Sequence, residues 1–218
     1  MRVVTALHNA KDVLKAGSLD LNGSLLRAEL TQNHRIFSRR FLAELLPKDG
    51  VGAEIGVFTG LFSTTLLDIA RPSRAYFVDP WWEAFGPNYP NWGRYTDRGR
   101  LSTSVAHRTA VRRINSHARD AKTEVLVEYS TTFFPRMPDR YFDWIYLDST
   151  HSYEGTVKEL DLIKTKLKRG AILAGDDWHD DPTHRHHGIT KAVLEAVSRG
   201  EYEEISRFPA LQWAVRAL

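Results

Sequence analysis

The sequence of 218 residues contains no cysteine. Disulfide bonds, thiolate nucleophiles and zinc ribbons are therefore excluded. No segment approaches the roughly 18 consecutive apolar residues that a membrane-spanning helix needs. Residues 1–8 also lack the long apolar stretch of a signal peptide. We accordingly expect a cytoplasmic protein with no membrane partner.

The sequence also lacks internal repeats, low-complexity tracts and Gly/Ser-rich linkers. With 42% hydrophobic and 26% charged residues it has the composition of an ordinary globular protein, and its length suits one domain over residues 1–218. The net charge is only +3, although arginines are dense between Arg94 and Arg119. Such a run suits phosphate binding or a solvated helix face. Acidic residues interrupt it, and we do not expect a nucleic-acid partner.

The hydrophobic pattern divides the chain into a helical N-terminal part and an alternating remainder. Apolar residues at helical spacing in the segment 24–46 predict a helical cap over residues 1–50. From residue 51 onward, strand-like segments alternate with helix-like ones, which predicts an α/β fold with a mostly parallel sheet covered by helices on both faces. Seven strands are expected, at 51–57, 74–78, 124–129, 142–147, 171–174, 202–208 and 211–215, the last two forming an antiparallel hairpin.

A glycine-containing turn follows the first predicted strand. The segment from Glu54 to Gly60 reads EIGVFTG, and Asp79 ends the second strand about twenty-five residues later. Glycines allow a tight turn and a close approach of ligand to backbone. The Gly-x-Gly-x-x-Gly pattern of dinucleotide sites is absent. The negative charge of Glu54 would oppose a pyrophosphate and suits a cofactor with a cationic amino-acid part, while Asp79 can accept ribose hydroxyls.

The segment from Val51 to Pro80 resembles the first two motifs of class I methyltransferases, which use S-adenosylmethionine (SAM). The resemblance implies a Rossmann-like core over residues 51–218. It also implies cofactor contacts by Glu54, Gly56, Gly60 and Asp79. Ser130 and Thr131 follow the third strand, where this family contacts adenine, although the acidic residue that is usual there is absent.

Three carboxylates and a histidine follow the fourth and fifth predicted strands. Asp148 ends the fourth strand, Asp176 and Asp177 end the fifth, and His151 lies three residues after Asp148. Neighbouring parallel strands lie about 5 Å apart, so we expect these side chains to converge. Clustered carboxylates repel one another unless a cation or proton is bound, and an all-oxygen set suits Mg²⁺. His151 or Asp148 would remove the proton of an acceptor hydroxyl.

This second group of residues resembles the Mg²⁺-dependent sugar O-methyltransferases of the macrocin and mycinamicin type. The resemblance implies that Asp148, Asp176 and Asp177 bind the metal and that His151 is the general base. With only about fifty residues before the first strand, the chain is shorter than the macrolide enzymes. A small sugar or glycoside, such as a mannoside, is therefore the expected acceptor.

An aromatic segment at residues 81–100 is expected to form an irregular lid loop over the acceptor, because glycine and proline interrupt it repeatedly. Aromatic rings stack on sugar faces, although a packed surface loop or a dimer contact would also explain them. The candidate acceptor contacts are Trp81, Trp82, Tyr89, Trp92, Trp178 and His179. The neighbouring His184, His186 and His187 would line the pocket, face solvent or compete for transition metals.

Two other methyltransferase functions remain open. A catechol-like acceptor would also place adjacent oxygens on one metal, and the basic stretch leaves a nucleic-acid methyltransferase as a weaker alternative. A homodimer is a further expectation, for which the N-terminal helices would supply a face.

Overall fold

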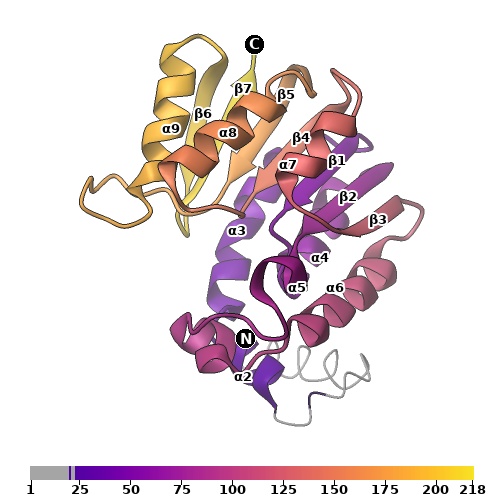
Figure 1. Ribbon diagram of the computed structural model, residues 1–218. Helices are drawn as coiled ribbons and strands as arrows, with labels where there is room; N and C mark the ends of the chain where they lie inside the picture. Colours follow the sequence, from indigo (N-terminus) through magenta and orange to yellow (C-terminus); the bar gives the residue numbers. More distant parts are fainter. Residues whose placement is uncertain (1–19, 21–22) are drawn as a thin grey trace.

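The computed structural model describes Asp20 and residues 23–218, except for the side chains of Asn33, His34, Arg35 and Ile205. Much of the expected cap over residues 1–50 therefore lies outside the described residues. A seven-stranded sheet forms the centre of the molecule, in the order β3-β2-β1-β4-β5-β7-β6 (Figure 1). The strands are β1 Val51–Ile55, β2 Arg74–Asp79, β3 Lys122–Val127, β4 Phe142–Leu147, β5 Leu167–Gly175, β6 Tyr202–Phe208 and β7 Gln212–Ala217.

The first five strands are parallel, and β7 pairs antiparallel with both β5 and β6. This confirms the predicted α/β fold with a mostly parallel sheet and an antiparallel C-terminal hairpin. The chain runs outward from β1 to β3 and then returns to β4 on the other side of β1. The order of strands thus reverses between β1 and β4, which is where open α/β sheets bind ligands.

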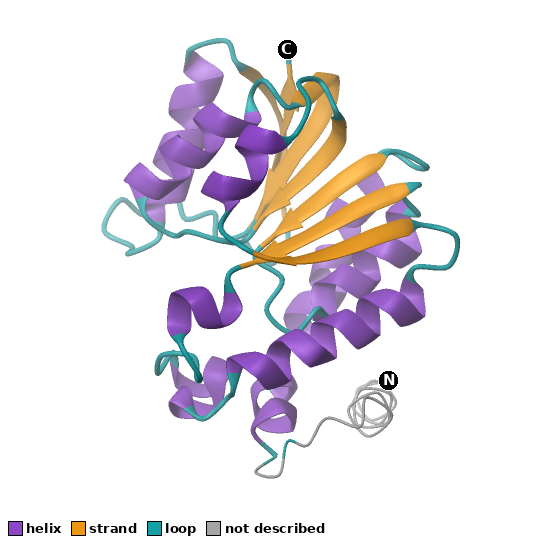
Figure 2. Cartoon of the chain, turned by 45° about the vertical axis from the view of Figure 1, so that its right-hand side comes forward, coloured by secondary structure: helices purple, strands orange, loops and turns teal. Residues whose placement is uncertain are grey.

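Helices cover both faces of the sheet (Figure 2). One face packs against α7 Ser130–Phe133, α8 Tyr153–Ile163 and α9 His187–Ser198. The other packs against α3 Asn33–Leu45, α4 Leu61–Ala70 and α6 Thr103–His117, with α2 Ser24–Leu30 and α5 Trp81–Phe85 beside α6. Two 3-10 helices complete the described elements, η1 Gly93–Gly99 and η2 Phe134–Arg136.

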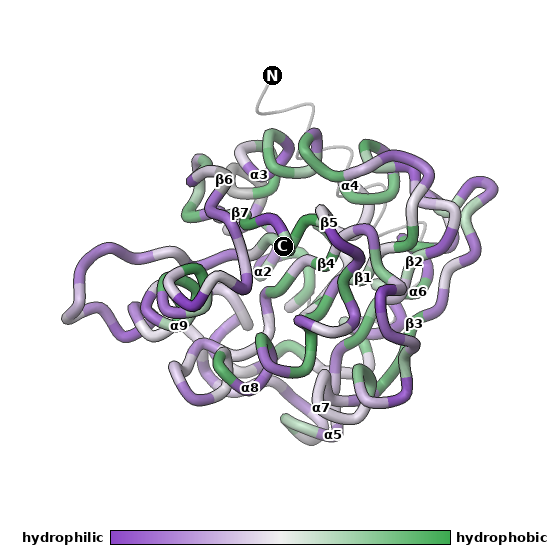
Figure 3. Tube along the Cα trace, turned by 90° about the horizontal axis from the view of Figure 1, so that it is seen from above, coloured by the Kyte–Doolittle hydropathy of each residue, from purple (hydrophilic) through white to green (hydrophobic). Residues whose placement is uncertain are grey.

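The central strands are apolar on both sides because each side faces a helical layer. In β4, Trp144 and Tyr146 point toward α3 and α4, whereas Ile145 and Leu147 point toward α8 and α9. Figure 3 shows hydrophobic colour along the central strands and hydrophilic colour on the outer loops. Burying a side chain of this size contributes about 1.5–3 kcal/mol. The fold is thus held by two apolar layers that fix the ends of the strands.

The N-terminal helices are tied to the rest of the domain by ion pairs. Glu29 on α2 accepts two hydrogen bonds from Arg113 on α6, at 2.5 and 2.8 Å, and both residues are buried. Arg27 contacts Asp97 of η1 at 2.9 Å. Loss of one partner of a buried pair such as Glu29–Arg113 costs about 3–5 kcal/mol. These contacts hold α2 and η1 on the same side of the domain as α6.

The aromatic segment 81–100 is more ordered than a loop. It begins with the short helix α5 and ends in η1, and a bridge from Asn88 to Ser102 closes it. Trp81 is fully buried at its start. Within the described part of the chain, the search for a helix long and apolar enough to cross a membrane found none.

Candidate active site

A cavity of about 920 Å³ opens at the carboxyl ends of the parallel strands. Its wall includes residues that directly follow β1, β2, β4 and β5, together with α3 and the aromatic segment. The cavity therefore lies at the reversal of strand order between β1 and β4. Its volume is within the range of pockets that hold a nucleoside-sized ligand.

Two glycines shape the turn between β1 and α4. Gly56 has a φ of +91°, and a Cβ at this position would lie 1.9 Å from the backbone oxygen of Asp148. Gly60 begins α4 with a φ of +70°, and its Cβ would lie 2.8 Å from the Cα of Ala110. The positive φ values and these close approaches require glycine. The EIGVFTG motif is thus explained by packing as well as by its position at the cavity.

Glu54 is buried at the end of β1, with 1% of its surface exposed. It accepts a hydrogen bond from the hydroxyl of Ser63 on α4. Burial raises the pKa of Glu54 to about 8, and the hydrogen bond from Ser63 only partly offsets this. At neutral pH the carboxyl is therefore mostly protonated. The raised pKa therefore disfavours the full negative charge that the sequence suggested.

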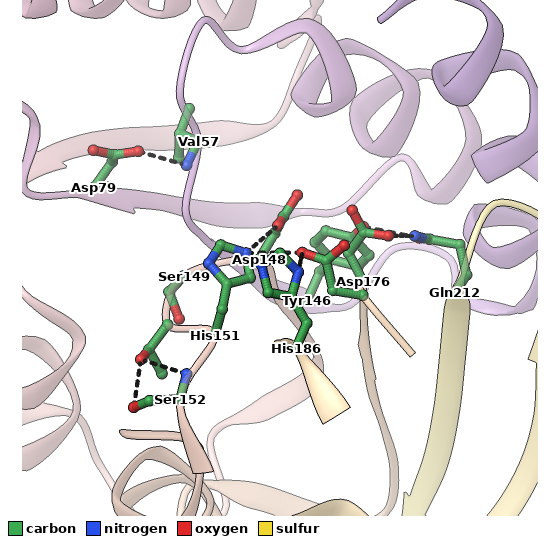
Figure 4. A network of polar contacts seen from close by, with 12 residues as sticks. Val57, Asp79, Tyr146, Asp148, Ser149, His151, Ser152, Asp176, His186 and Gln212 are labelled. Atoms are coloured by element: carbon green, nitrogen blue, oxygen red, sulfur yellow. Dashed lines mark hydrogen bonds and ion pairs between the residues drawn. The ribbon is translucent and has the colours of Figure 1, made fainter. Parts of the chain in front are cut away.

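Asp79 ends β2 and holds the glycine turn in place. One of its oxygens accepts hydrogen bonds from the backbone amides of Val57 at 2.9 Å (Figure 4) and Phe58 at 2.8 Å. The other accepts from the backbone amide of Trp81 at 2.8 Å. Burial raises the pKa of Asp79 by more than these three hydrogen bonds lower it. Asp79 also lines the cavity, so it orders the turn and faces the space beside it.

Ser130 lies on the cavity wall and belongs to a buried hydrogen-bond network. Its hydroxyl donates to Glu159 of α8 at 2.6 Å, and the hydroxyl of Ser149 donates to both oxygens of Glu159 at 2.7 and 2.8 Å. Glu159 was not among the residues expected at the site. The sequence pattern that could have identified Glu159 is a carboxylate on the buried face of α8, between Thr156 and Ile163.

The three predicted acids converge as expected. One oxygen from each of Asp148, Asp176 and Asp177 lies within 4.8 Å of the others. Sequence analysis did not foresee Arg39 of α3, whose guanidinium contacts Asp148 at 3.2 Å and also pairs with Asp176. Gln212 of β7 donates to the other oxygen of Asp176 at 2.5 Å. Burial alone would lower the pKa of Arg39, but nearby hydroxyls and carboxylates raise it above its ordinary value.

His151 reaches the same cluster from the turn before α8. Its Nε2 lies 2.8 Å from an oxygen of Asp177 and 3.9 Å from an oxygen of Asp148. His186 stacks on His151 with ring centres 4.5 Å apart, and its Nδ1 lies 3.3 Å from Asp177 (Figure 4). Burial would lower the pKa of His151, but the hydrogen bond with Asp177 and the charge of Asp148 raise it.

The donor set fits a divalent cation. Three carboxylates face one guanidinium, so with His151 neutral two negative charges are left for a divalent cation to balance. Carboxylate oxygens are the ligands that Mg²⁺ prefers. Because Arg39 and Gln212 each engage one oxygen of Asp176, Asp148 and Asp177 are the stronger candidates for direct ligation.

The structure separates the expected acceptor residues into two groups. Tyr89, Trp92 and His179 line the cavity. The other three lie elsewhere, because Trp81 is buried and donates to the backbone oxygen of Phe58, Trp82 packs against His107, and Trp178 is buried in the core. We therefore remove Trp81, Trp82 and Trp178 from the candidate contacts.

Further residues of the wall were not foreseen. Tyr95 stacks on Phe58 with ring centres 4.7 Å apart, and both line the cavity. Among the described residues, three cavity-lining side chains have a buried polar atom without a hydrogen-bond partner: Nε2 of Gln32, Nε of Arg39 and the hydroxyl of Tyr89. Buried polar groups normally find partners. These three atoms are therefore candidate contacts to a bound ligand.

A family model described as a methyltransferase domain matches residues 53–178, from β1 to the residue after the paired acids. The chain belongs to this family. The match covers the glycine turn, Asp79, Asp148 and His151 of this methyltransferase domain, so the candidate site lies within the family region. A search of curated proteins gave no sequence match.

Solved structures share the fold of this methyltransferase domain at low sequence identity. A Streptococcus mutans protein described as a methyltransferase in complex with SAH is 12% identical, with a TM-score of 0.54 over 84% of this chain and 96% of its own. A SAM-dependent methyltransferase from Aquifex aeolicus is 15% identical, with a TM-score of 0.55 over 85% and 92%. An rRNA methylase from Streptococcus thermophilus is 15% identical, with a TM-score of 0.53 over 84% and 95%. These likenesses confirm the predicted Rossmann-like fold.

Proposed function

We propose that the protein is a SAM-dependent O-methyltransferase that methylates a sugar or glycoside hydroxyl with the help of a divalent cation. The observation that carries the proposal is the position of His151. It lies 2.8 Å from Asp177, beside an acid cluster, on the wall of the same cavity as the glycine turn. A base, a cation site and a cofactor turn on one cavity form the minimum set for metal-assisted O-methyl transfer.

The cofactor would occupy the side of the cavity formed by the β1–α4 turn. Gly56 would let the backbone approach the ligand, Asp79 would lie near the ribose, and Ser130 at the start of α7 would lie near adenine. Glu54 would face the cationic amino-acid part of SAM. Since the pKa of Glu54 is raised to about 8, arrival of an ammonium group would favour release of its proton. The SAH named for the Streptococcus mutans structure is consistent with this assignment.

His151 would remove the acceptor proton. Its Nε2 lies 2.8 Å from an oxygen of Asp177, which would orient the ring and stabilise its protonated form after the proton is taken up. SAM bound beside the β1–α4 turn would supply the methyl group to the acceptor oxygen, and His151 would hold the proton that the hydroxyl gives up. A divalent cation held by Asp148, Asp176 and Asp177 would lower the pKa of the hydroxyl. Asp148 is the alternative base.

The acceptor side has the chemistry of a sugar site. Trp92 lines the cavity and is 45% exposed, so its face is open to a ligand. Tyr89 and Gln32 contribute buried polar atoms that have no partner among the described residues. An aromatic face with nearby hydrogen-bonding groups suits a sugar ring, whose C–H face and hydroxyls need both. A catechol-like acceptor would use the ring stacking but fewer of the polar groups.

The test is a methyl-transfer assay with radiolabelled SAM and a panel of glycosides, catechols and tRNA, with Mg²⁺ or with excess EDTA. We expect label on a glycoside only with Mg²⁺ and its loss in His151→Ala. His117→Ala is the matched control, because His117 pairs with Asp68 on the far helices α6 and α4. Label on tRNA alone, or unchanged turnover in EDTA, would refute the proposal.

A nucleic-acid methyltransferase is the second candidate. Six arginines of the basic stretch are exposed, namely Arg94, Arg98, Arg100, Arg108, Arg112 and Arg119. The seventh, Arg113, is buried with Glu29 and is structural. Exposed arginines can bind phosphates, and rRNA methylases are among the proteins with this fold. The tRNA arm of the assay, extended with ribosomal RNA, tests this alternative.

A further inference from the structure

Three histidines come together in the loop between β5 and α9. One ring nitrogen from each of His179, His184 and His186 lies within 4.8 Å of the others. The rings of His179 and His184 stack with centres 3.5 Å apart, and the ring of His186 lies 5.4 Å from that of His184. At this spacing, one nitrogen of each ring can reach the same cation.

We propose that His179, His184 and His186 form a second metal site, selective for a borderline transition ion such as Zn²⁺ or Co²⁺. Neutral imidazole binds these ions, whereas Mg²⁺ prefers oxygen and retains its water. Three protein nitrogens leave a fourth position of a tetrahedral ion open. All three residues line the large cavity, so this position would face the acceptor space.

A side-chain contact orients the ring of His186, and backbone contacts hold His179 in place in the loop. The Nδ1 of His186 lies 3.3 Å from a carboxylate oxygen of Asp177, which leaves its Nε2 for a metal. The backbone amide of His179 donates to the hydroxyl of Thr190 at 2.9 Å, and its carbonyl contacts the Nδ1 of His187 at 2.8 Å. In known metal sites, a carboxylate holds a metal-binding histidine in the way that Asp177 contacts His186.

This site is separate from the acid cluster in its ligands but shares Asp177 as a neighbour. Asp177 contacts both His186 and His151, at 3.3 and 2.8 Å. Asp177 would therefore connect a transition ion on His186 to the proposed base, His151. The link to catalysis rests on the proposed function, whereas metal binding at the three histidines does not.

The experiment is a Co²⁺ titration of the metal-free protein, followed by visible absorption, in a large excess of Mg²⁺ over Co²⁺. Cobalt on nitrogen ligands in a four-coordinate site absorbs in the visible range, so binding is read without any activity assay. We expect one Co²⁺ to bind despite the Mg²⁺. His184→Gln should weaken binding by at least about tenfold, because it removes one of three ligands. His117→Gln, on a distant helix, should bind as the parent does.

Asp148→Asn separates this site from the acid cluster and should keep the cobalt spectrum. Two results would overturn the proposal: binding in His184→Gln that equals the parent, or displacement of Co²⁺ by Mg²⁺. The first would place the ion on a group without His184, and the second would place it on the carboxylates. Circular dichroism of His184→Gln tests that the variant is folded, and His184→Ala provides a second variant with the same expectation. Absent methyl transfer with intact cobalt binding would refute the proposed function alone.

Discussion

Replacement of Arg39 by methionine separates the two ways in which the acid cluster can be neutralised. Arg39 is 6% exposed and contacts Asp148 at 3.2 Å, while its other terminal nitrogen pairs with Asp176. Two unit charges about 4 Å apart interact by roughly 4 kcal/mol at an effective dielectric constant of 20, before desolvation is counted. Removing one partner of a buried pair costs about 3–5 kcal/mol. We therefore expect Arg39→Met to lower the free energy of unfolding in EDTA by about 3 kcal/mol.

The same substitution should strengthen binding of a divalent cation. The cluster then holds three negative charges and no fixed positive charge, so a cation replaces what the guanidinium supplied. A gain of about 1.4–2.8 kcal/mol corresponds to a tenfold to hundredfold lower Kd. A cation that binds only the folded state restores stability by mass action. The variant should therefore gain much more stability from Mg²⁺ or Ca²⁺ than the parent does.

The assay is thermal unfolding of the parent, Arg39→Met and Arg39→Lys in EDTA and across a Mg²⁺ titration. A loss of 3 kcal/mol corresponds to a fall in Tm of about 6–12 °C for a domain of this size. Arg119→Met is the matched control, because the side chain of Arg119 is 62% exposed. An Arg39→Met protein as stable as the parent in EDTA, or one whose Tm does not respond to the cation, would refute this reasoning.

Three further substitutions test other parts of the cavity. The pKa of Glu54 is about 8 in the folded protein, whereas that of an unfolded glutamate is near 4.3. The free energy of unfolding should therefore fall by a few kcal/mol as the pH rises between these values. Urea titrations of Glu54→Gln across this pH range should show a smaller fall. Gly56→Ala would place a Cβ 1.9 Å from the backbone oxygen of Asp148. We therefore expect the free energy of unfolding to fall by roughly 3 kcal/mol and calorimetry to detect no SAM binding. Normal SAM affinity would contradict this expectation. Tyr89→Phe removes a buried hydroxyl that has no partner among the described residues. Because we assign this hydroxyl to the acceptor, the affinity for the acceptor should fall about fivefold to tenfold while Tm stays unchanged. A lower Tm with unchanged acceptor affinity would count against that role.

The fold could be predicted because its determinants are local. Hydrophobic runs of strand length alternate with helical periodicity from Val51 onward, and parallel pairing follows from that alternation. The ends of the strands were less certain. The sequence placed the start of the fifth strand near residue 171, because the polar segment 168–170 interrupts the apolar pattern. In the structure the strand begins at Leu167 and continues through this segment.

Part of the site also follows from local sequence. Asp148 and Asp176 end neighbouring parallel strands, so their convergence is a consequence of β4 pairing with β5. The aromatic residues show the opposite case. Trp81 and Trp92 lie in the same Gly/Pro-rich segment, yet one is fully buried and the other is 45% exposed. Residue type alone does not distinguish them, because burial depends on the helices that pack over the segment.

The cationic side of the cluster could not be predicted at all, for a physical reason. Arg39 lies 109 residues before Asp148 and occupies a helix whose sequence pattern marks it as one charged residue among several. Only the packing of α3 against the sheet brings its guanidinium to the carboxylates. Arg39 offsets one of the three negative charges of the acid cluster. A single divalent cation would then balance the two that remain. The affinity of the proposed cation site should therefore depend on the position of α3, although α3 contributes no ligand to it.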